Sequence, residues 1–304
     1  MNAEAAHPAL PKRAPSKLGV WLRLGRVSNL PTVWSNVLAA LALAGGLAPE
    51  PRVLALALAF SVFYVGGMYL NDAFDRHIDA AQRPTRPIPS GQVSAATVFA
   101  IGFGALLLGT VLTALVAWQT GASVVRAALS SLALAGCIVF YDVYHKQNPL
   151  SPLVMGACRV LIYVAVAYSV SDHLTSQVLL GAAALWCHLI GLTYAAKQEA
   201  FNKLTRLWPL AFLALPILYG AWISIPEPLV WPFLILFVAW IFYALHYLRQ
   251  GPQRAVPQAV VRLIAAISLL DAVLIAATGA WLGAAIAAAM CALTRLFQRV
   301  VPGT

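Results

Sequence analysis

Four polar residues on one short stretch have the types and spacing of a metal site. Asn71, Asp75 and Asp79 recur every fourth residue, and Asp72 stands beside the first of them. On a helix, residues at i, i+4 and i+8 share one face over about 12 Å of rise. Like charges at this spacing repel each other, so a compensating cation is expected. Carboxylate and amide oxygens suit Mg²⁺, which commonly takes one or two carboxylates together with phosphate oxygens and water.

A solvated acidic helix end is the alternative interpretation of this stretch. It is disfavoured because the chain has only ten Asp and Glu residues, and three of them fall within these eight positions. Basic residues follow at once. Arg83 and Arg86 stand on a segment, 83–91, that also holds three prolines and a glycine, so the connection is stiff and non-helical. Two arginines held beside a metal site suit phosphate recognition, whereas ordinary loop charge is the competing explanation.

Composition identifies the elements that must position these residues as membrane helices. Of the 304 residues, 61% are apolar and 10% are charged, against about 25% charged in a soluble domain. These values exclude a soluble globular domain, a disordered chain and a disulfide-stapled module. The net charge of +10 indicates contact with anionic lipid headgroups rather than with nucleic acid. The expected fold is an all-α polytopic bundle in the lipid bilayer.

Apolar runs long enough to cross a membrane give nine or ten predicted spans. Thr278 and Gly279 alone separate the last two, which form either a tight hairpin or one broken helix. The predicted spans are residues 30–48, 52–70, 93–117, 123–141, 150–170, 177–196, 207–225, 228–248, 257–277 and 280–297.

The basic residues alternate from one connection to the next. Sixteen of the 20 Lys and Arg residues lie in the two terminal segments and in the connections after even-numbered spans. The positive-inside rule therefore predicts cytoplasmic termini and motif loops, in the plasma (inner) membrane. Residues 1–16 are polar and rich in Ala and Pro, so we expect a mobile cytoplasmic segment, followed by a single transmembrane domain over 17–304.

At the acidic stretch the sequence resembles a known family. The run from Asn71 to Asp79, followed by the segment 86–91 (Arg-Pro-Ile-Pro-Ser-Gly), is similar to the first signature of the UbiA superfamily of intramembrane prenyltransferases. Arg26, with Leu30-Pro31-Thr32 after it, is also similar to the start of the family's first span. Residues 141–146 and 192–194 most resemble the branch found in Ebo-type gene clusters.

The resemblance implies a helical bundle around a central cavity that cytoplasmic loops close. Family members bind an isoprenyl diphosphate through Mg²⁺ and transfer the prenyl group to a lipophilic, commonly aromatic acceptor. Carried over to this sequence, Asn71, Asp75 and Asp79 match the metal ligands, and Asp72 matches the additional acid of the motif. The resemblance thus assigns Asp72, Asp75 and Asp79 to catalysis, and Arg26, Arg83 and Arg86 to the diphosphate.

The second acidic motif of the family, Asp-x-x-x-Asp after span 6, is missing here. Residues 197–206 contain no aspartate, and they carry Lys197, Lys203 and Arg206 instead. We infer that these cations contact the diphosphate directly and replace a second metal. After span 4, Lys146 is a further expected phosphate contact, although Tyr141 precedes it by five residues where the family shows four.

Four of the polar residues inside predicted spans are considered individually: Arg159, Asp271, Asn36 and His188. Arg159 and Asp271 are costly in hydrocarbon, so they are expected to face the bundle interior, as a structural ion pair or as functional groups. Asn36 and His188 are interpreted as hydrogen-bonding groups between helices.

Two other function classes stay open beside prenyl transfer. A transporter or lipid-binding protein could keep one metal loop without catalysis, since intramembrane charges are typical of transporters. A CDP-alcohol phosphotransferase is disfavoured because no D-G-x-x-A-R run precedes the aspartates.

The basic second loop generates the first prediction. Replacing Lys203 or Arg206 by Ala is expected to weaken prenyl diphosphate binding far more than Mg²⁺ binding, because the lost charge faces the phosphate. Titration calorimetry with each ligand measures both affinities. Unchanged diphosphate affinity in both variants would reject this role for the loop.

Overall fold

The computed structural model describes residues 16–47, 50–146, 148–199, 208–249 and 255–303. Within these ranges the chain is all-α, as predicted, with no strand. The α-helices are α1 (Lys17–Leu24), α2 (Leu30–Leu43), α3 (Glu50–Phe74), α4 (Arg76–Gln82), α5 (Ala95–Thr120), α6 (Val124–Tyr144), α7 (Ser151–Tyr168), α8 (Ser176–Glu199), α9 (Ala214–Ile223), α10 (Trp231–His246), α11 (Ala255–Ala276) and α12 (Trp281–Phe297). Short 3₁₀ helices are η1 (Val27–Asn29), η2 (Trp208–Leu213), η3 (Pro228–Val230) and η4 (Tyr247–Arg249).

Each of the ten predicted spans corresponds to an apolar helix. Seven helices are long and apolar enough to cross a membrane, and three shorter ones cover residues 27–43, 210–223 and 281–297. The last pair of spans forms a hairpin rather than one broken helix. Gly279 has a φ of +78°, a left-handed conformation that glycine adopts without steric cost, and α12 packs back against α11.

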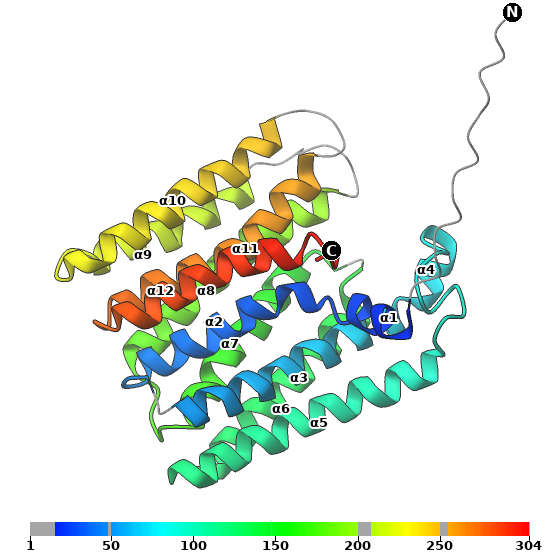
Figure 1. Cartoon of the computed structure of the whole chain (residues 1–304), viewed down its shortest axis with the longest axis horizontal. Helices are drawn as coiled ribbons and strands as arrows, with labels where there is room; N and C mark the ends of the chain where they lie inside the picture. The colour runs from blue at the N-terminus through cyan, green and yellow to red at the C-terminus, as the bar shows by residue number, and fades with distance from the viewer. Residues whose placement is uncertain (1–15, 48–49, 147, 200–207, 250–254, 304) are drawn as a thin grey trace, which may run out of the picture.

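The membrane helices lie side by side, from α10 at one edge of Figure 1 to α5 at the other. α11 is the central helix, because it packs against α2, α8, α10 and α12 and 89% of its apolar window is buried. α6 is a peripheral helix, with 22% of its window buried. Apolar residues all round α11 are what a helix enclosed by other helices requires.

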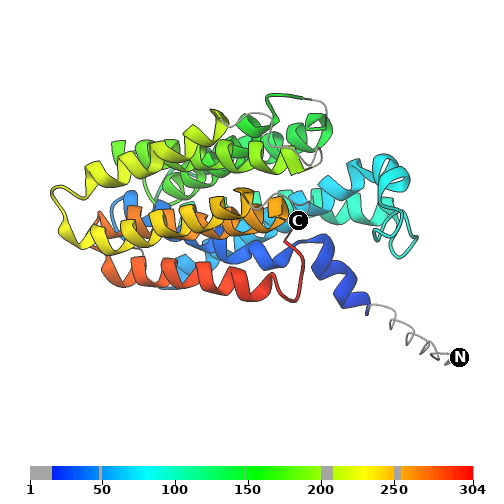
Figure 2. The same ribbon diagram turned by 90° about the horizontal axis from the view of Figure 1, so that it is seen from above.

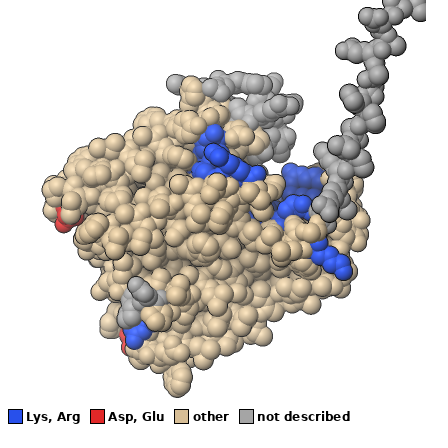
Figure 3. Space-filling model, in the orientation of Figure 1, with Lys and Arg blue, Asp and Glu red and all other residues tan. Residues whose placement is uncertain are grey.

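The two ends of the bundle differ in charge. Helices α1 and α4 and the C-terminus lie toward the same end of the bundle, as Figures 1 and 2 show. On the face seen in Figure 3, most of the visible Lys and Arg side chains gather near that end. This agrees with the alternation of basic connections along the chain.

A buried polar network joins three of the helices. The carboxylate of Asp271 on α11 accepts hydrogen bonds from Ser35 Oγ at 2.6 Å, Asn36 Nδ2 at 2.8 Å and Tyr163 Oη at 2.5 Å. The Oδ1 atom of Asn36 in turn accepts from Arg159 at 2.6 Å. Arg159 and Asp271 are therefore linked through Asn36 on α2 and do not contact each other directly.

The network fits the interpretation of Asn36 as a group that bonds helices together, and His188 behaves likewise. The Nε2 atom of His188 on α8 lies 2.9 Å from the carbonyl oxygen of Leu263 on α11. Such polar contacts hold membrane helices at fixed positions, because hydrocarbon offers no alternative partners.

The network predicts that Asp271→Ala destabilises the fold strongly. The change leaves Asn36 Nδ2 and Tyr163 Oη buried without an acceptor, and we expect it to cost more than about 3 kcal/mol of unfolding free energy. Thermal unfolding in detergent measures the effect. Asp172→Ala is the control, because that side chain is 48% exposed and should change stability by less than about 1 kcal/mol. Equal unfolding temperatures for the two variants would contradict the prediction.

Candidate active site

The acidic motif, Asn71, Asp72, Asp75 and Asp79, lies where α3 passes into α4. The amide of Asp75 donates to the carbonyl of Asn71 at 3.0 Å, and that of Asp79 donates to the carbonyl of Asp75 at 2.9 Å. Helical spacing thus continues across the junction at residue 75. Asn71, Asp75 and Asp79 are all buried, whereas His77 and Ile78 are exposed, so the predicted common face is present.

Cations from three separate parts of the chain compensate the acids. Asp72 pairs with both Arg26 and Arg86 at 3.1 Å. Arg86 also reaches Asp79 at 2.7 Å, and Lys146 reaches Asp75 at 2.8 Å. The repulsion expected within the motif is therefore offset by basic side chains in the structure.

One of these cations, Arg26, has a strained backbone conformation. Arg26 has a φ of +42°, the left-handed conformation, which no other non-glycine residue adopts in the described ranges. This conformation is costly for a residue with a Cβ atom and persists where surrounding contacts enforce it. Here Arg26 contacts Met68 Sδ at 3.2 Å and Asn71 Oδ1 at 3.5 Å besides Asp72.

The proline-rich segment holds Arg86 through turns of its own backbone. The amide of Arg86 donates to the carbonyl of Arg83, and the amide of Ser90 donates to the carbonyl of Arg86, both at 3.0 Å. Gly91 closes the segment with a φ of +76°. The predicted stiff, non-helical connection is present.

His145 is a neighbour of the motif that the sequence did not reveal. Its ring stacks on Tyr141 with a centroid distance of 4.8 Å, and its Nε2 atom lies 3.6 Å from Asp75. Burial lowers the pKa of His145 below its usual range, although Asp75 acts in the opposite direction. Burial thus favours the neutral form of His145, whereas Lys146 forms an ion pair with Asp75.

Asp142 is a second residue of the site that sequence reasoning missed. Its Oδ1 atom accepts from Asn71 Nδ2 at 3.0 Å, and its side chain is buried. A signal was available, because Asp142 is one of only ten acidic residues in the chain and stands four positions before Lys146.

A chamber of about 740 Å³ opens beside the motif. Arg26, Arg83 and Arg86 line it, and most of the other lining residues are apolar: Met68, Met155, Leu189, Leu192, Ala196, Val260, Ile264 and Ile267. Arg26 and Arg86 stand between the chamber and the acids that they contact. The site thus combines basic side chains with largely apolar walls.

The remaining residues that were predicted to contact the substrate differ in where the structure places them. Arg83 lines the chamber but makes no ion pair with the acidic motif within the described residues. Lys197 donates to the carbonyl of Asn148 at 2.5 Å, so it fixes the connection after α6. Lys203 and Arg206 lie outside the described residues.

The donor atoms of the motif fit Mg²⁺ in part. Asn71, Asp75 and Asp79 offer amide and carboxylate oxygens, the chemistry that this ion prefers. Within the described ranges, however, no three His, Cys, Asp or Glu side chains form a group that could hold a metal ion. The arrangement therefore fits an ion held by one or two carboxylates together with phosphate oxygens, and it does not fit a cage made by protein alone.

Sequence relatives include several digeranylgeranylglyceryl phosphate synthases. The chain is 27% identical over 279 residues to digeranylgeranylglyceryl phosphate synthase of Methanopyrus kandleri, covering 86% of this chain and 90% of the relative. It is 39% identical over 111 residues to the synthase of the same name from Ignicoccus hospitalis, covering 36% of this chain and 35% of that one. Protoheme IX farnesyltransferase of Macrococcus caseolyticus is 25% identical over 153 residues, about half of each chain.

Solved structures share the fold. A structure described as that of a digeranylgeranylglyceryl phosphate synthase in membranes has a TM-score of 0.61 at 17% identity, covering 86% of this chain and 98% of the other. A UbiA homologue from Aeropyrum pernix K1 has a TM-score of 0.50 at 18% identity, with coverages of 90% and 97%.

The profile of the UbiA prenyltransferase family matches residues 31–263. This range holds the complete acidic motif, Arg86, Lys146 and most of the residues that line the chamber. The chain belongs to the UbiA prenyltransferase family and is a transferase of prenyl groups.

Proposed function

We propose that the protein transfers an isoprenyl group from a prenyl diphosphate to a lipophilic, aromatic acceptor in a Mg²⁺-dependent reaction. One observation supports this above all others. Arg26 and Arg86, which pair with the acidic motif, also line a chamber whose other walls are largely apolar. A diphosphate needs the basic side chains, whereas a prenyl chain and its acceptor need the apolar walls.

The cations act on the leaving diphosphate. Arg26 and Arg86 present guanidinium groups, whose fork geometry matches phosphate oxygens. Lys146 is 38% exposed, so it can turn from Asp75 toward an incoming phosphate. Fixed positive charge placed where negative charge develops lowers the barrier to cleavage of the carbon–oxygen bond. Mg²⁺ bound to Asp75 and Asp79 would supply additional charge neutralisation as a Lewis acid.

The chamber protects the reactive carbon. Leu189, Leu192 and Ile264 are among the apolar residues that line it, and such walls exclude water from an allylic cation. Water exclusion favours transfer to the acceptor over hydrolysis. The names of the relatives support this chemistry, because they include a farnesyltransferase and synthases of a geranylgeranyl-bearing lipid.

In the proposed orientation the protein lies in the plasma (inner) membrane, and the acidic motif faces the cytoplasm. The supporting observation is the concentration of basic residues in the terminal segments and even-numbered connections. Soluble prenyl diphosphates would then reach the motif from the cytoplasm, and acceptors would enter from the bilayer.

Asp75→Asn is expected to reduce diphosphate release from geranylgeranyl diphosphate by about 10²-fold or more. The substitution removes the charge that holds Lys146 and that a Mg²⁺ ion would need. A phosphate-coupled assay on purified protein with Mg²⁺ measures the rate. Asp172→Asn is the matched control and should release diphosphate at the wild-type rate. Full activity of Asp75→Asn would end this assignment.

Arg86 and Arg83 give a matched pair on one loop. Arg86→Gln is expected to weaken binding of the diphosphate by about 10- to 100-fold, because a charge-assisted contact is lost at the motif. Arg83→Gln should have a smaller effect, since Arg83 lines the chamber without pairing with the acids. Titration calorimetry with geranylgeranyl diphosphate compares them. A larger loss in Arg83→Gln would contradict the proposal that Arg86 is the stronger diphosphate contact.

A further inference from the structure

A polar cluster lies on the outside of the bundle, where α10 and α12 both pack against α11. Tyr243 belongs to α10, Tyr247 to η4, Arg262 to α11 and Arg295 to α12. The guanidinium of Arg262 lies 3.9 Å from the ring centroid of Tyr247 and 5.0 Å from that of Tyr243. Arg295 interacts electrostatically with Arg262 and with both tyrosines. These four residues are called the outer cluster below.

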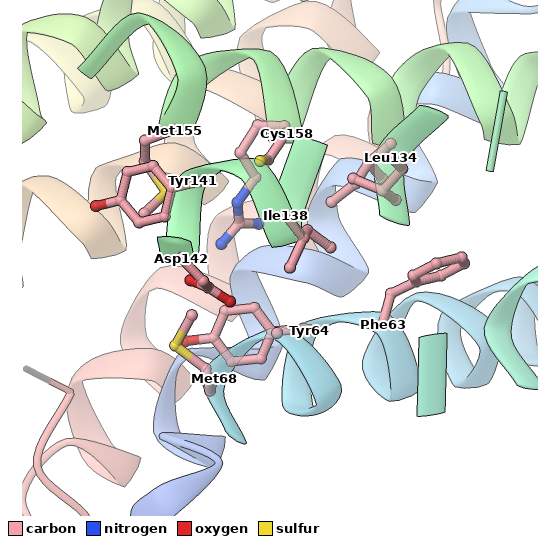
Figure 4. A pocket seen from close by; sticks show the side chains of 12 residues that line it. Phe63, Tyr64, Met68, Leu134, Ile138, Tyr141, Asp142, Met155 and Cys158 are labelled. Carbon is pink, nitrogen blue, oxygen red and sulfur yellow. The ribbon is translucent and has the colours of Figure 1, made fainter. Parts of the chain in front are cut away.

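The outer cluster is separate from the cavities beside the acidic motif. Val260 and Ile264 of α11 line the chamber, and Arg262 stands two positions from each of them, so helical geometry places it on the opposite side of α11. The small recess shown in Figure 4 is lined by residues of α3, α6 and α7. The outer cluster therefore belongs to a different surface from the one assigned to the prenyl diphosphate.

The positive charge of this surface lacks an acidic partner. In the part of the chain that the structure describes, neither Arg262, Arg295 nor the nearby Arg299 forms an ion pair. Arg262 is 8% exposed, and Arg262 and Arg299 both repel the charge of Arg295. Buried charge without a counter-charge is unfavourable, so an anion bound from outside the chain would stabilise the cluster.

Hydrogen bonds fix Arg262 and orient the two tyrosines. Its Nη1 atom donates to the carbonyl oxygen of Gln258 at 2.8 Å and to the side-chain oxygen at 2.7 Å. Its Nη2 atom donates to the hydroxyl oxygen of Tyr247 at 3.1 Å and to that of Tyr243 at 3.5 Å. The two hydroxyl oxygens lie 3.1 Å apart, so one hydroxyl hydrogen is shared between them. The other hydroxyl hydrogen points away from the pair and can be donated to a ligand.

Ligands can reach the donors that remain. Tyr243 is 46% exposed and Tyr247 is half-buried. Arg295 is also half-buried, and it donates to Gln298 Oε1 at 2.7 Å, which occupies one of the five N–H groups of its guanidinium. Arg299 follows four positions later and is exposed. A phenol O–H and guanidinium N–H groups are donors that suit phosphate oxygens.

The neighbouring residues indicate that the anion is part of a lipid. Phe242, beside Tyr243, is 66% exposed, and Leu296, beside Arg295, is 54% exposed. Exposed apolar side chains on membrane helices face acyl chains, whereas Tyr and Arg near helix ends lie at headgroup depth. Figure 3 shows basic side chains at the surface over the neighbouring ends of α11 and α12, and the acidic side chains visible in that view lie toward the opposite end.

We propose that the outer cluster binds an anionic phospholipid, whose phosphate accepts from a tyrosine hydroxyl group and from Arg295. The acyl chains would lie along the exposed apolar faces of α10 and α12. The lipid supplies the counter-charge that the described residues do not provide. This inference is independent of the proposed prenyl transfer, and it differs from diffuse attraction between basic proteins and anionic lipids because the donors have fixed positions.

The test compares phosphatidylglycerol, which carries a net negative charge, with zwitterionic phosphatidylcholine of the same acyl chains. Native mass spectrometry of the full chain released from detergent micelles measures both affinities. The wild type should bind phosphatidylglycerol at least about tenfold more tightly. In Arg295→Gln the preference should fall below about threefold, because a charge-assisted contact is lost.

A second variant separates oriented donors from charge. Tyr243→Phe combined with Tyr247→Phe removes both hydroxyl groups and keeps the rings and the net charge. Binding of phosphatidylglycerol should weaken by about fivefold or more, because the phosphate loses a donor. An unfolding temperature measured without lipid shows that the variant is folded.

Two matched controls remove one positive charge elsewhere. Arg126→Gln acts at the other end of the bundle, where the arginine side chain is 51% exposed. Arg23→Gln acts on α1, at the same end as the outer cluster. Both variants should keep the wild-type preference for phosphatidylglycerol. Inorganic phosphate, added in excess over the lipid, should not displace phosphatidylglycerol, because it lacks the acyl chains.

Four results would overturn the inference. Equal affinities of the two lipids in the wild type would show that the cluster does not select an anion. An unchanged preference in Arg295→Gln would place the lipid elsewhere. An equal loss in Arg23→Gln would show diffuse charge attraction, and displacement by inorganic phosphate would show a site for a soluble anion.

Discussion

Charge pairing at the edge of the membrane is the constraint on which the site depends. Asp72, Asp75 and Asp79 are each less than a tenth exposed, and isolated carboxylates at such depth would be strongly unfavourable. The chain resolves this with cations from residue 26, from the proline-rich segment and from the end of α6. The same cations are those that a diphosphate would bind, so stability and substrate recognition draw on one set of contacts.

Hydrogen bonds elsewhere in the bundle fix the relative positions of the helices. Asp271, Asn36 and Arg159 join α11, α2 and α7. Arg159 also lines the chamber, so the network that fixes the helices also fixes one polar part of the chamber wall. A fully bonded polar network favours a single arrangement of the helices that contribute to it.

Local patterns in the sequence were sufficient to predict much of this. Apolar runs located the helices, and the spacing of Asn71, Asp75 and Asp79 established their common face, because both signals are periodic along the chain. Features that depend on distant contacts were not predictable. The left-handed backbone of Arg26 accompanies side-chain contacts with α3, and the chamber exists only once α3, α7, α8 and α11 meet. The contact between Asp142 and Asn71 joins residues 71 positions apart, and no short motif records it.

The unequal lengths of the outer helices have a consequence for the surrounding lipid. α5 has 26 residues and α12 has 17, which correspond to about 39 Å and about 26 Å along their axes. The hydrocarbon layer of a bilayer is about 30 Å thick. A rigid protein with a long helix on one side and a short helix on another is accommodated by tilting. Alternatively, the bilayer is locally thicker beside α5 and thinner beside α12. The thickness of the surrounding bilayer would thus vary around the protein, and the headgroups of the two leaflets would be closest together next to α12.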